Sequence, residues 1–145
     1  KWAMLLYNTY WDSFLDSIKL YEGALSLLSS SAKNAQICLL TDLTAHIQYR
    51  KIEKLGLNEH VSLIVTSEEA GREKPHPQIF FMGLYKLGMK PDEVCMIGDN
   101  FKKDIVGAAN LGIKSIWLNS DNKRESYDKA LVTEVKEFKE ILELL

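Results

Sequence analysis

One stretch of the sequence carries two aspartates at a spacing suited to binding a metal ion. The apolar run Val94–Ile97 is followed by Gly98 and Asp99 and, five residues further on, by Asp104. Gly98 lets the backbone turn tightly where the strand ends, so both carboxylates can face that end. Mg²⁺ prefers oxygen ligands of this kind and keeps several of its waters. The alternative interpretation is local, with Asp104 as a helix N-cap and Asp99 as a turn residue.

Two further segments place polar groups where a phosphate could be bound. Lys74 stands just before a helix that Pro75 and Pro77 open, and its charge could neutralise a phosphate and a carboxylate together. Thr41 and Asp42 follow a short apolar run, where a hydroxyl beside a free backbone N–H can bind a phosphate oxygen. Each segment also has a local interpretation, as a solvated lysine and as a threonine bonded to nearby backbone.

The elements that must position these residues alternate between helix-like and strand-like patterns, which is typical of an α/β domain with a mostly parallel sheet. Two helices open the chain, and the order β-α-β-α-β-α-β follows. The expected strands are Gln36–Leu40, Val61–Val65, Val94–Ile97 and Ile113–Leu118, with a sheet-edge strand near Leu131. The expected helices are Met4–Lys19, Glu22–Ser30, Leu43–Leu55, Pro75–Leu87, Asp104–Leu111 and Glu134–Leu144, and Ser67–Lys74 is expected to be a polar loop. Because ligands bind beyond the carboxyl ends of strands in such sheets, the residues named above should share one rim.

Composition limits the classes of partner. The chain has 145 residues, 46% of them hydrophobic and 26% charged, with a net charge of −2, which suits one globular domain. It has no block of Lys and Arg for nucleic acid and no apolar run near the roughly 20 residues that span a bilayer. Cys38 and Cys95 lie in the apolar runs ICLL and VCMI, so both are expected as buried, reduced thiols of a cytoplasmic protein.

Taken together, the segments LLTD, KPHPQIF and IGDNFKKD resemble three of the four signature motifs of the haloacid dehalogenase superfamily, in the family's order. The resemblance runs from Leu20 to about Ile116 and is closest to the phosphatase branch with a helical cap. It implies a Rossmann-like core with a mostly parallel sheet flanked by helices.

The resemblance also implies a role for each matching residue. Thr41 would hold a phosphoryl oxygen beside Asp42, and Lys74 would stabilise the phosphoryl group and the charge of the nucleophile. Asp99 would bind Mg²⁺ directly or through water, and Asp104 would support that metal or orient Lys74. Besides Mg²⁺, the resemblance implies that the site binds a small phosphorylated substrate.

The family's fourth motif, DxDx[TV], is absent, because no two aspartates of the chain are two residues apart. In the family this motif ends the first, central strand and carries the nucleophile. One explanation is a fragment, with residues 1–19 as the end of the helical cap or a linker helix and 20–145 as the core without its central strand. The other is a degenerate first strand with Asn8 and Tyr10 in place of the aspartates. Both explanations predict that this chain alone is inactive, and the first predicts self-association through unpaired sheet edges.

The leading functional expectation is a Mg²⁺-dependent phosphomonoester hydrolase that acts through an aspartyl-phosphate. A metal-independent 2-haloacid dehalogenase and a binding module on an inactive core are the alternatives. A receiver domain of the response-regulator type fits the order of Thr41, Lys74 and Asp99 poorly.

Overall fold

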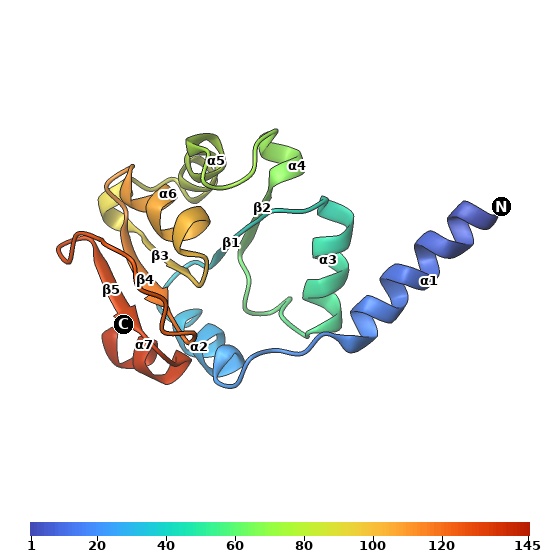
Figure 1. Cartoon of the computed structure of the whole chain (residues 1–145), viewed down its shortest axis with the longest axis horizontal. Coiled ribbons are helices and arrows are strands. Elements are labelled where there is room, and N and C mark those ends of the chain that lie inside the picture. The colour runs from blue at the N-terminus through green and yellow to red at the C-terminus, as the bar shows by residue number, and fades with distance from the viewer.

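A computed structural model describes residues 1–145 and confirms the predicted α/β fold with parallel strand pairing (Figure 1). The helices are α1 Trp2–Ser17, α2 Ala24–Ser31, α3 Ala45–Lys54, α4 Ser67–Ala70, α5 Pro77–Leu87, α6 Gly107–Ala109 and α7 Phe138–Leu144. The strands are β1 Cys38–Thr41, β2 Leu63–Thr66, β3 Cys95–Gly98, β4 Lys114–Leu118 and β5 Val132–Val135. A 3₁₀ turn covers Pro91–Glu93, and a π-helical turn, Phe101–Val106, runs into α6. None of the helices is both long and apolar enough to cross a bilayer.

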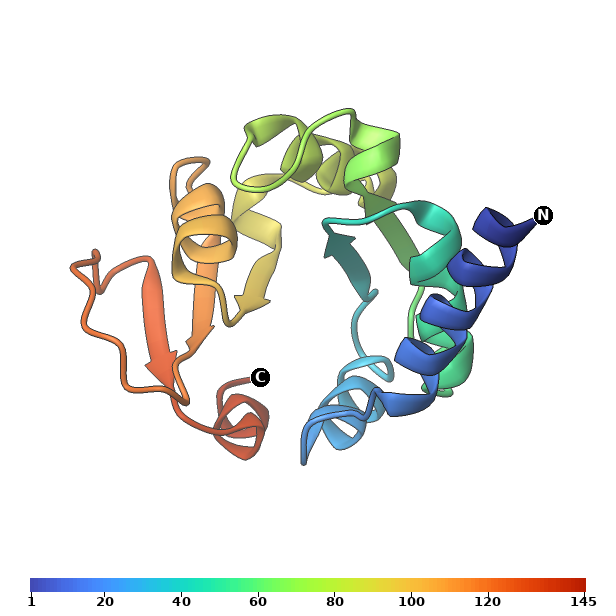
Figure 2. The ribbon, with the colours of Figure 1, turned by 45° about the vertical axis from the view of Figure 1, so that its right-hand side comes forward.

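The strands form two separate sheets. In one, β1 pairs in parallel with β2, with Cys38 opposite Leu63 and Thr41 opposite Thr66. In the other, β3, β4 and β5 pair in parallel in that order. Figure 2 shows β1 and β3 facing each other with no strand between them. Each of these two strands therefore has one edge without a strand partner.

Helix α5 packs on β1 and β2 and also contacts α6. It begins with Pro77 at its first position and ends before Gly88, which has a φ of 67° that glycine adopts without strain. Its buried face belongs to a core formed by Val65, Ala70, Ile79, Phe80, Leu84, Ala108 and Ile113. Leu40 of β1 and Met96 of β3 both pack against this core, which therefore joins the two sheets.

A second core lies among β4, β5, α2 and α7. It consists of Leu27, Ile116, Val135 and Ile141, with Ile97 of β3 packed against it. Helices α2 and α7 are in contact, so the two halves of the molecule also meet on this side. Helix α1 packs on α3, where Asp16 forms an ion pair with Lys54 at 2.6 Å. Otherwise it projects away from the rest of the molecule (Figure 1). The assignment of residues 1–19 to a cap stays a prediction.

Most predicted boundaries differ from the observed ones by one or two residues, and three element predictions were wrong by more than that or in kind. Ser67–Ala70 is helical where a loop was expected, because the Thr66 hydroxyl accepts a hydrogen bond from Glu69 N and caps the turn. The helical segment after β3 begins at Phe101 rather than Asp104, because Asn100 caps it by accepting from Lys103 N.

At the end of the chain, Glu134 lies in β5 and the closing helix starts later, at Phe138. Val132 and Val135 of that strand are buried against neighbouring elements, and burial of these two β-branched residues favours the extended conformation over an early helix.

The prediction of two buried cysteines was also wrong. Cys38 is half-buried and Cys95 is exposed. Val94 and Met96 pack against the α5 core, so Cys95 between them points to the opposite face, beside the unpaired edge of β3. An apolar strand run predicts burial only where other elements cover the face to which each side chain points.

Candidate active site

Lys74 lies at the centre of a polar cluster at the carboxyl ends of β1 and β3. Its Nζ is 2.8 Å from Asp104 Oδ1 and donates a hydrogen bond to the Leu40 carbonyl at 2.9 Å. The side chains of Lys74 and Asp104 are only 12% and 7% exposed. Asp104 Oδ1 has no hydrogen-bond partner, so the ion pair with Lys74 alone compensates its burial.

Asp42 connects the loop after β1 to two other segments. Its Oδ1 accepts from Lys74 N at 3.0 Å, and its Oδ2 accepts from Lys103 Nζ at 2.9 Å. Lys103 Nζ also donates to Glu73 Oε2 at 3.1 Å. Burial raises the pKa of Asp42, but the hydrogen bonds and charges of Lys103 and Lys74 outweigh it, so this pKa lies below its ordinary value. The hydrogen bonds to Asp42 and Glu73 raise the pKa of Lys103.

The loop after β3 holds Asp104 against Gly98. Asp104 Oδ2 accepts a hydrogen bond from Asn100 N at 3.0 Å. A Cβ added to Gly98 would lie 2.5 Å from Asp104 Cβ and 2.6 Å from its Oδ2, so only glycine fits there. The local interpretation of Asp104 as an N-cap was therefore wrong, because Asn100 caps the helix and Asp104 is buried one turn later.

Thr41 and Asp99 stand beside this cluster without joining its hydrogen bonds. Thr41 is the last residue of β1 and is half-buried, and Asp99 follows β3 directly and is exposed. The Asp99 backbone carbonyl accepts from Trp117 Nε1 at 3.3 Å, which fixes the backbone of this loop against β4.

The structure thus brings Asp42, Lys74 and Asp104 into one network and places Thr41 and Asp99 next to the same strand ends. Sequence reasoning did not identify Lys103 and Glu73 as members of the cluster. Lys103 precedes Asp104 in the segment IGDNFKKD, but nothing in the sequence distinguishes it from Lys102. No group of three or more His, Cys, Asp or Glu residues that could hold a metal ion is present, so Asp99 and Asp104 as metal ligands stay a prediction.

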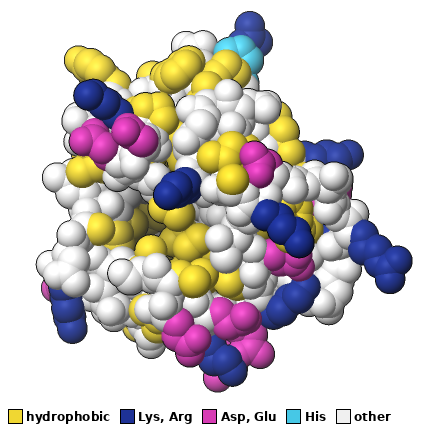
Figure 3. All heavy atoms as spheres, turned by 90° about the vertical axis from the view of Figure 1, so that its left-hand side faces the viewer, with side chains coloured by type: hydrophobic (Ala, Val, Ile, Leu, Met, Phe, Trp, Pro, Cys, Tyr) yellow, Lys and Arg dark blue, Asp and Glu magenta, His cyan; other side chains and the backbone are white.

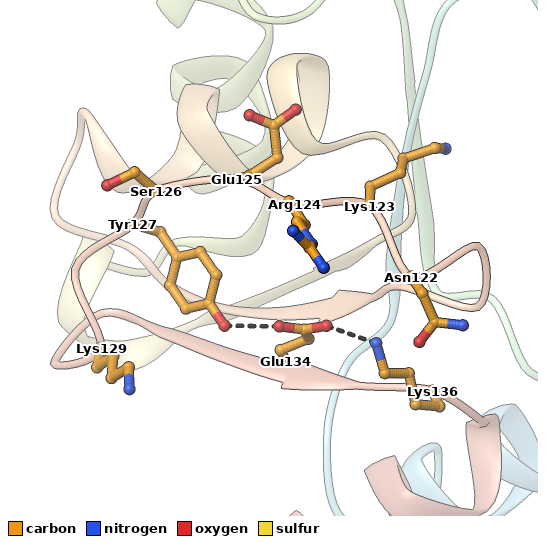
Figure 4. Close-up of a pocket in the computed structure, with 9 residues that line it drawn as sticks. All are labelled: Asn122, Lys123, Arg124, Glu125, Ser126, Tyr127, Lys129, Glu134 and Lys136. Carbon is orange, nitrogen blue, oxygen red and sulfur yellow. Dashed lines mark hydrogen bonds and ion pairs between the residues drawn. The ribbon is translucent and has the colours of Figure 1, made fainter.

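A second polar depression, of about 500 Å³, lies over the loop between β4 and β5 (Figure 4). Glu134 accepts hydrogen bonds there from Lys136, Tyr127 and Asn119, each at 2.7 Å. These hydrogen bonds lower the pKa of Glu134 to about 2, and the one from Lys136 has the largest effect. None of the site residues predicted from the sequence lines this depression.

Comparison with known proteins gives one consistent family. The family model described as haloacid dehalogenase-like hydrolase matches residues 3–118. The chain is 33% identical over 129 residues to ribulose-1,5-bisphosphate 5-phosphatase of Halopiger xanaduensis, covering 88% of this chain and 54% of that protein. It is 35% identical over 125 residues to the pyrimidine 5′-nucleotidase YjjG of Escherichia coli, covering 85% of this chain and 55% of that protein.

Among solved structures, the HAD phosphatase from Thermococcus onnurineus superposes with a TM-score of 0.84 at 23% identity, covering 95% of this chain and 63% of that one. The likeness to this structure concerns the fold alone. The chain spans about half the length of the curated relatives it matches.

Proposed function

The chain belongs to the haloacid dehalogenase-like hydrolase family, and from this premise we propose that the whole protein hydrolyses phosphate monoesters of small metabolites. The observation that carries the proposal is the buried Lys74 ammonium, held between Asp104 Oδ1 and the Leu40 carbonyl where two strands end. The names of the relatives support it, since ribulose bisphosphate, nucleotide and phosphoserine phosphatases are among them.

Each residue then has a role that its position allows. The Lys74 ammonium would face the phosphoryl oxygens and stabilise the charge that develops on them. The Thr41 hydroxyl, which makes no hydrogen bond in the structure, would donate to one of these oxygens. Asp42 would keep the Lys74 backbone in place through the hydrogen bond from Lys74 N.

The charges around Lys74 favour a role for a divalent cation. Lys74 and Lys103 face three carboxylates, those of Asp42, Glu73 and Asp104, so the cluster alone would repel a dianionic phosphate. Asp99 and Asp104 supply carboxylate oxygens, which suit Mg²⁺, a cation that one or two carboxylates and several waters can hold. Asp99 would hold the metal, with Asp104 supporting it, and the metal would supply positive charge to the phosphate when bound.

The proposed reaction passes through an aspartyl-phosphate, and these 145 residues contain no pair of aspartates spaced for it. We therefore expect the chain by itself to be inactive. Dehalogenation of a 2-haloacid is the competing reaction, and it would not require a divalent cation.

The test uses the full translation product of the gene with p-nitrophenyl phosphate, with Mg²⁺ and with a chelator, and with 2-chloropropionate as the competing substrate. We expect hydrolysis that depends on Mg²⁺, and a loss of roughly 100-fold or more in kcat for Lys74→Met, by analogy with removal of one charge-stabilising donor. Lys102→Met, an exposed neighbour without an ion pair, is the matched control and should keep full activity. Chloride release without phosphatase activity would overturn the proposal.

A further inference from the structure

We propose that Lys103 is a positioning residue of the candidate active site. It holds the Asp42 carboxylate in place, and Asp42 in turn holds the backbone N–H of Lys74. Lys103 would therefore act through another side chain, without contact with the substrate. The effect on the reaction rests on the proposed function, whereas the effect on the Lys74 backbone can be tested without it.

The Asp42 carboxylate is bound by one donor at each oxygen. Lys74 N donates to Oδ1 at 3.0 Å, and Lys103 Nζ donates to Oδ2 at 2.9 Å. No other donor bonds to this carboxylate, and the Asp42 side chain is only 16% exposed. Removing the Lys103 ammonium would leave Oδ2 poorly solvated. Rotation of the carboxylate toward water would then break its bond to Lys74 N.

One turn of the chain fixes both ends of Lys74. Lys103 and Asp104 are consecutive residues of the π-helical turn Phe101–Val106. Asp104 binds the Lys74 ammonium at 2.8 Å. Lys103 reaches the Lys74 backbone by way of Asp42. Because π-helical turns are frequent at functional sites, this turn is a plausible place for residues that set the position of the Lys74 ammonium.

Lys103 is itself held at its backbone and at its ammonium. Its N–H donates to Asn100 Oδ1 at 2.9 Å, and its Nζ donates to Glu73 Oε2 at 3.1 Å as well as to Asp42. The hydrogen bonds to Asp42 and Glu73 raise the pKa of Lys103. The ammonium therefore stays charged at neutral pH and keeps its bond to Asp42.

The low exposure of Asp42 distinguishes this contact from ion pairs on the surface. Figure 3 shows Lys and Arg side chains lying beside Asp and Glu side chains on one face of the molecule. Lys139 and Glu137, which form another ion pair, are 75% and 61% exposed. Water and salt screen such pairs, so they contribute little to the fold. Water reaches the Asp42 carboxylate much less, so the contact with Lys103 should hold it more firmly.

Lys103 also determines the charge beside the proposed phosphate position. Asp42 follows Thr41, whose hydroxyl would donate to a phosphoryl oxygen in the proposed function. Without Lys103, the Lys74 ammonium alone would face the three carboxylates of the cluster. The cluster would then repel a dianionic phosphate more strongly. Loss of Lys103 should therefore weaken substrate binding and also loosen Lys74.

A double-mutant cycle in the full translation product, with p-nitrophenyl phosphate and Mg²⁺, tests whether Lys103 acts through Asp42. Lys103→Met should lower kcat/KM by roughly five- to tenfold, the value of about one hydrogen bond. In the background of Asp42→Ala, which removes the carboxylate, the same substitution should change kcat/KM by less than about twofold. Lys103→Arg keeps the charge and should retain most of the activity. Lys102→Met is the exposed control and should retain all of it.

Two results of this cycle would overturn the proposal, provided that circular dichroism shows each variant folded. Unchanged kcat/KM in Lys103→Met would show that Lys103 has no part in the reaction. An equal loss with and without the Asp42 carboxylate would show that Lys103 acts on the substrate or on the fold as a whole.

Hydrogen exchange at the Lys74 N–H, followed by NMR after selective labelling of lysine, tests the positioning without turnover. Lys103→Met should speed exchange of this N–H by roughly five- to tenfold. Exchange of the Lys86 N–H, within α5, should stay unchanged. Unchanged exchange at Lys74 would overturn the proposal whatever the activity. Faster exchange in a protein without Mg²⁺-dependent phosphatase activity would support the positioning of Lys74 and overturn the proposed function instead.

Discussion

Lys74 Nζ lies 2.8 Å from Asp104 Oδ1 and links the loop before α5 to the π-helical turn after β3. Through its hydrogen bond to the Leu40 carbonyl, the same ammonium reaches β1. One side chain therefore ties together the carboxyl ends of two sheets that share no strand pairing, and the geometry of the candidate site depends on it.

Replacing Lys74 by Met should destabilise the chain by about 3 kcal/mol, because it leaves the Asp104 carboxylate buried without a charged partner. The measurement is urea denaturation, with Lys102→Met as the exposed control. Adding Asp104→Asn to Lys74→Met should restore part of the loss, since the unpaired charge is then removed. If the losses in unfolding free energy of the two single substitutions simply add in the double variant, the ion pair contributes nothing to stability.

Replacing Lys103 by Met should raise the pKa of Asp42. The hydrogen bond and charge of Lys103 oppose the effect of burial there, and burial alone raises the pKa of a carboxyl group. An NMR titration of the Asp42 carboxyl carbon would record the change, and Lys102→Met should leave the titration as it is. An unchanged midpoint in Lys103→Met would mean that the Lys103 contact is not formed in solution.

Replacing Gly98 by Ala should destabilise the chain by about 1–3 kcal/mol, because the new methyl group would lie 2.5–2.6 Å from Asp104 in a packed site. Gly83→Ala is the matched control. Its methyl group would lie 3.0 Å from Leu40 Cδ1, the end of a side chain that can shift, and alanine favours the helix. The midpoint temperature of thermal unfolding should therefore be much lower in Gly98→Ala than in Gly83→Ala. The reverse order would contradict the close approach of Gly98 and Asp104.

The contribution of Glu134 to the stability of the fold should depend on pH in the acidic range. Its pKa falls from 4.5 to about 2 in the folded chain, so its contribution is complete above pH 4.5 and is lost as the pH falls towards 2. The difference in unfolding free energy between the unchanged chain and Glu134→Gln should shrink over that range. Glu125→Gln, in the same depression and without a hydrogen-bond partner, should show no such trend. A constant difference for Glu134→Gln would argue against the network with Lys136 and Tyr127.

The sequence predicted much of this arrangement because its signals are local. Apolar runs ending in LLTD and IGDN mark strand ends, and Pro77 with Gly88 marks the two ends of α5. Parallel pairing then places Thr41, Lys74 and Asp99 near one rim.

What the sequence could not predict depends on contacts between distant residues. The ion pair of Lys103 with Asp42 joins positions 61 residues apart, and Lys102 has the same local pattern. The exposure of Cys95 depends on which elements cover its face of β3, and no local pattern reveals that.

The most direct test of the proposed function compares two proteins in one assay, the full translation product of the gene and the 145-residue chain, each with p-nitrophenyl phosphate in the presence and absence of Mg²⁺. The account predicts Mg²⁺-dependent hydrolysis by the full product and none by the chain, which has the Lys74 cluster but no aspartate pair for the nucleophile. Hydrolysis by the isolated chain, or hydrolysis by the full product that a chelator leaves unchanged, would contradict it.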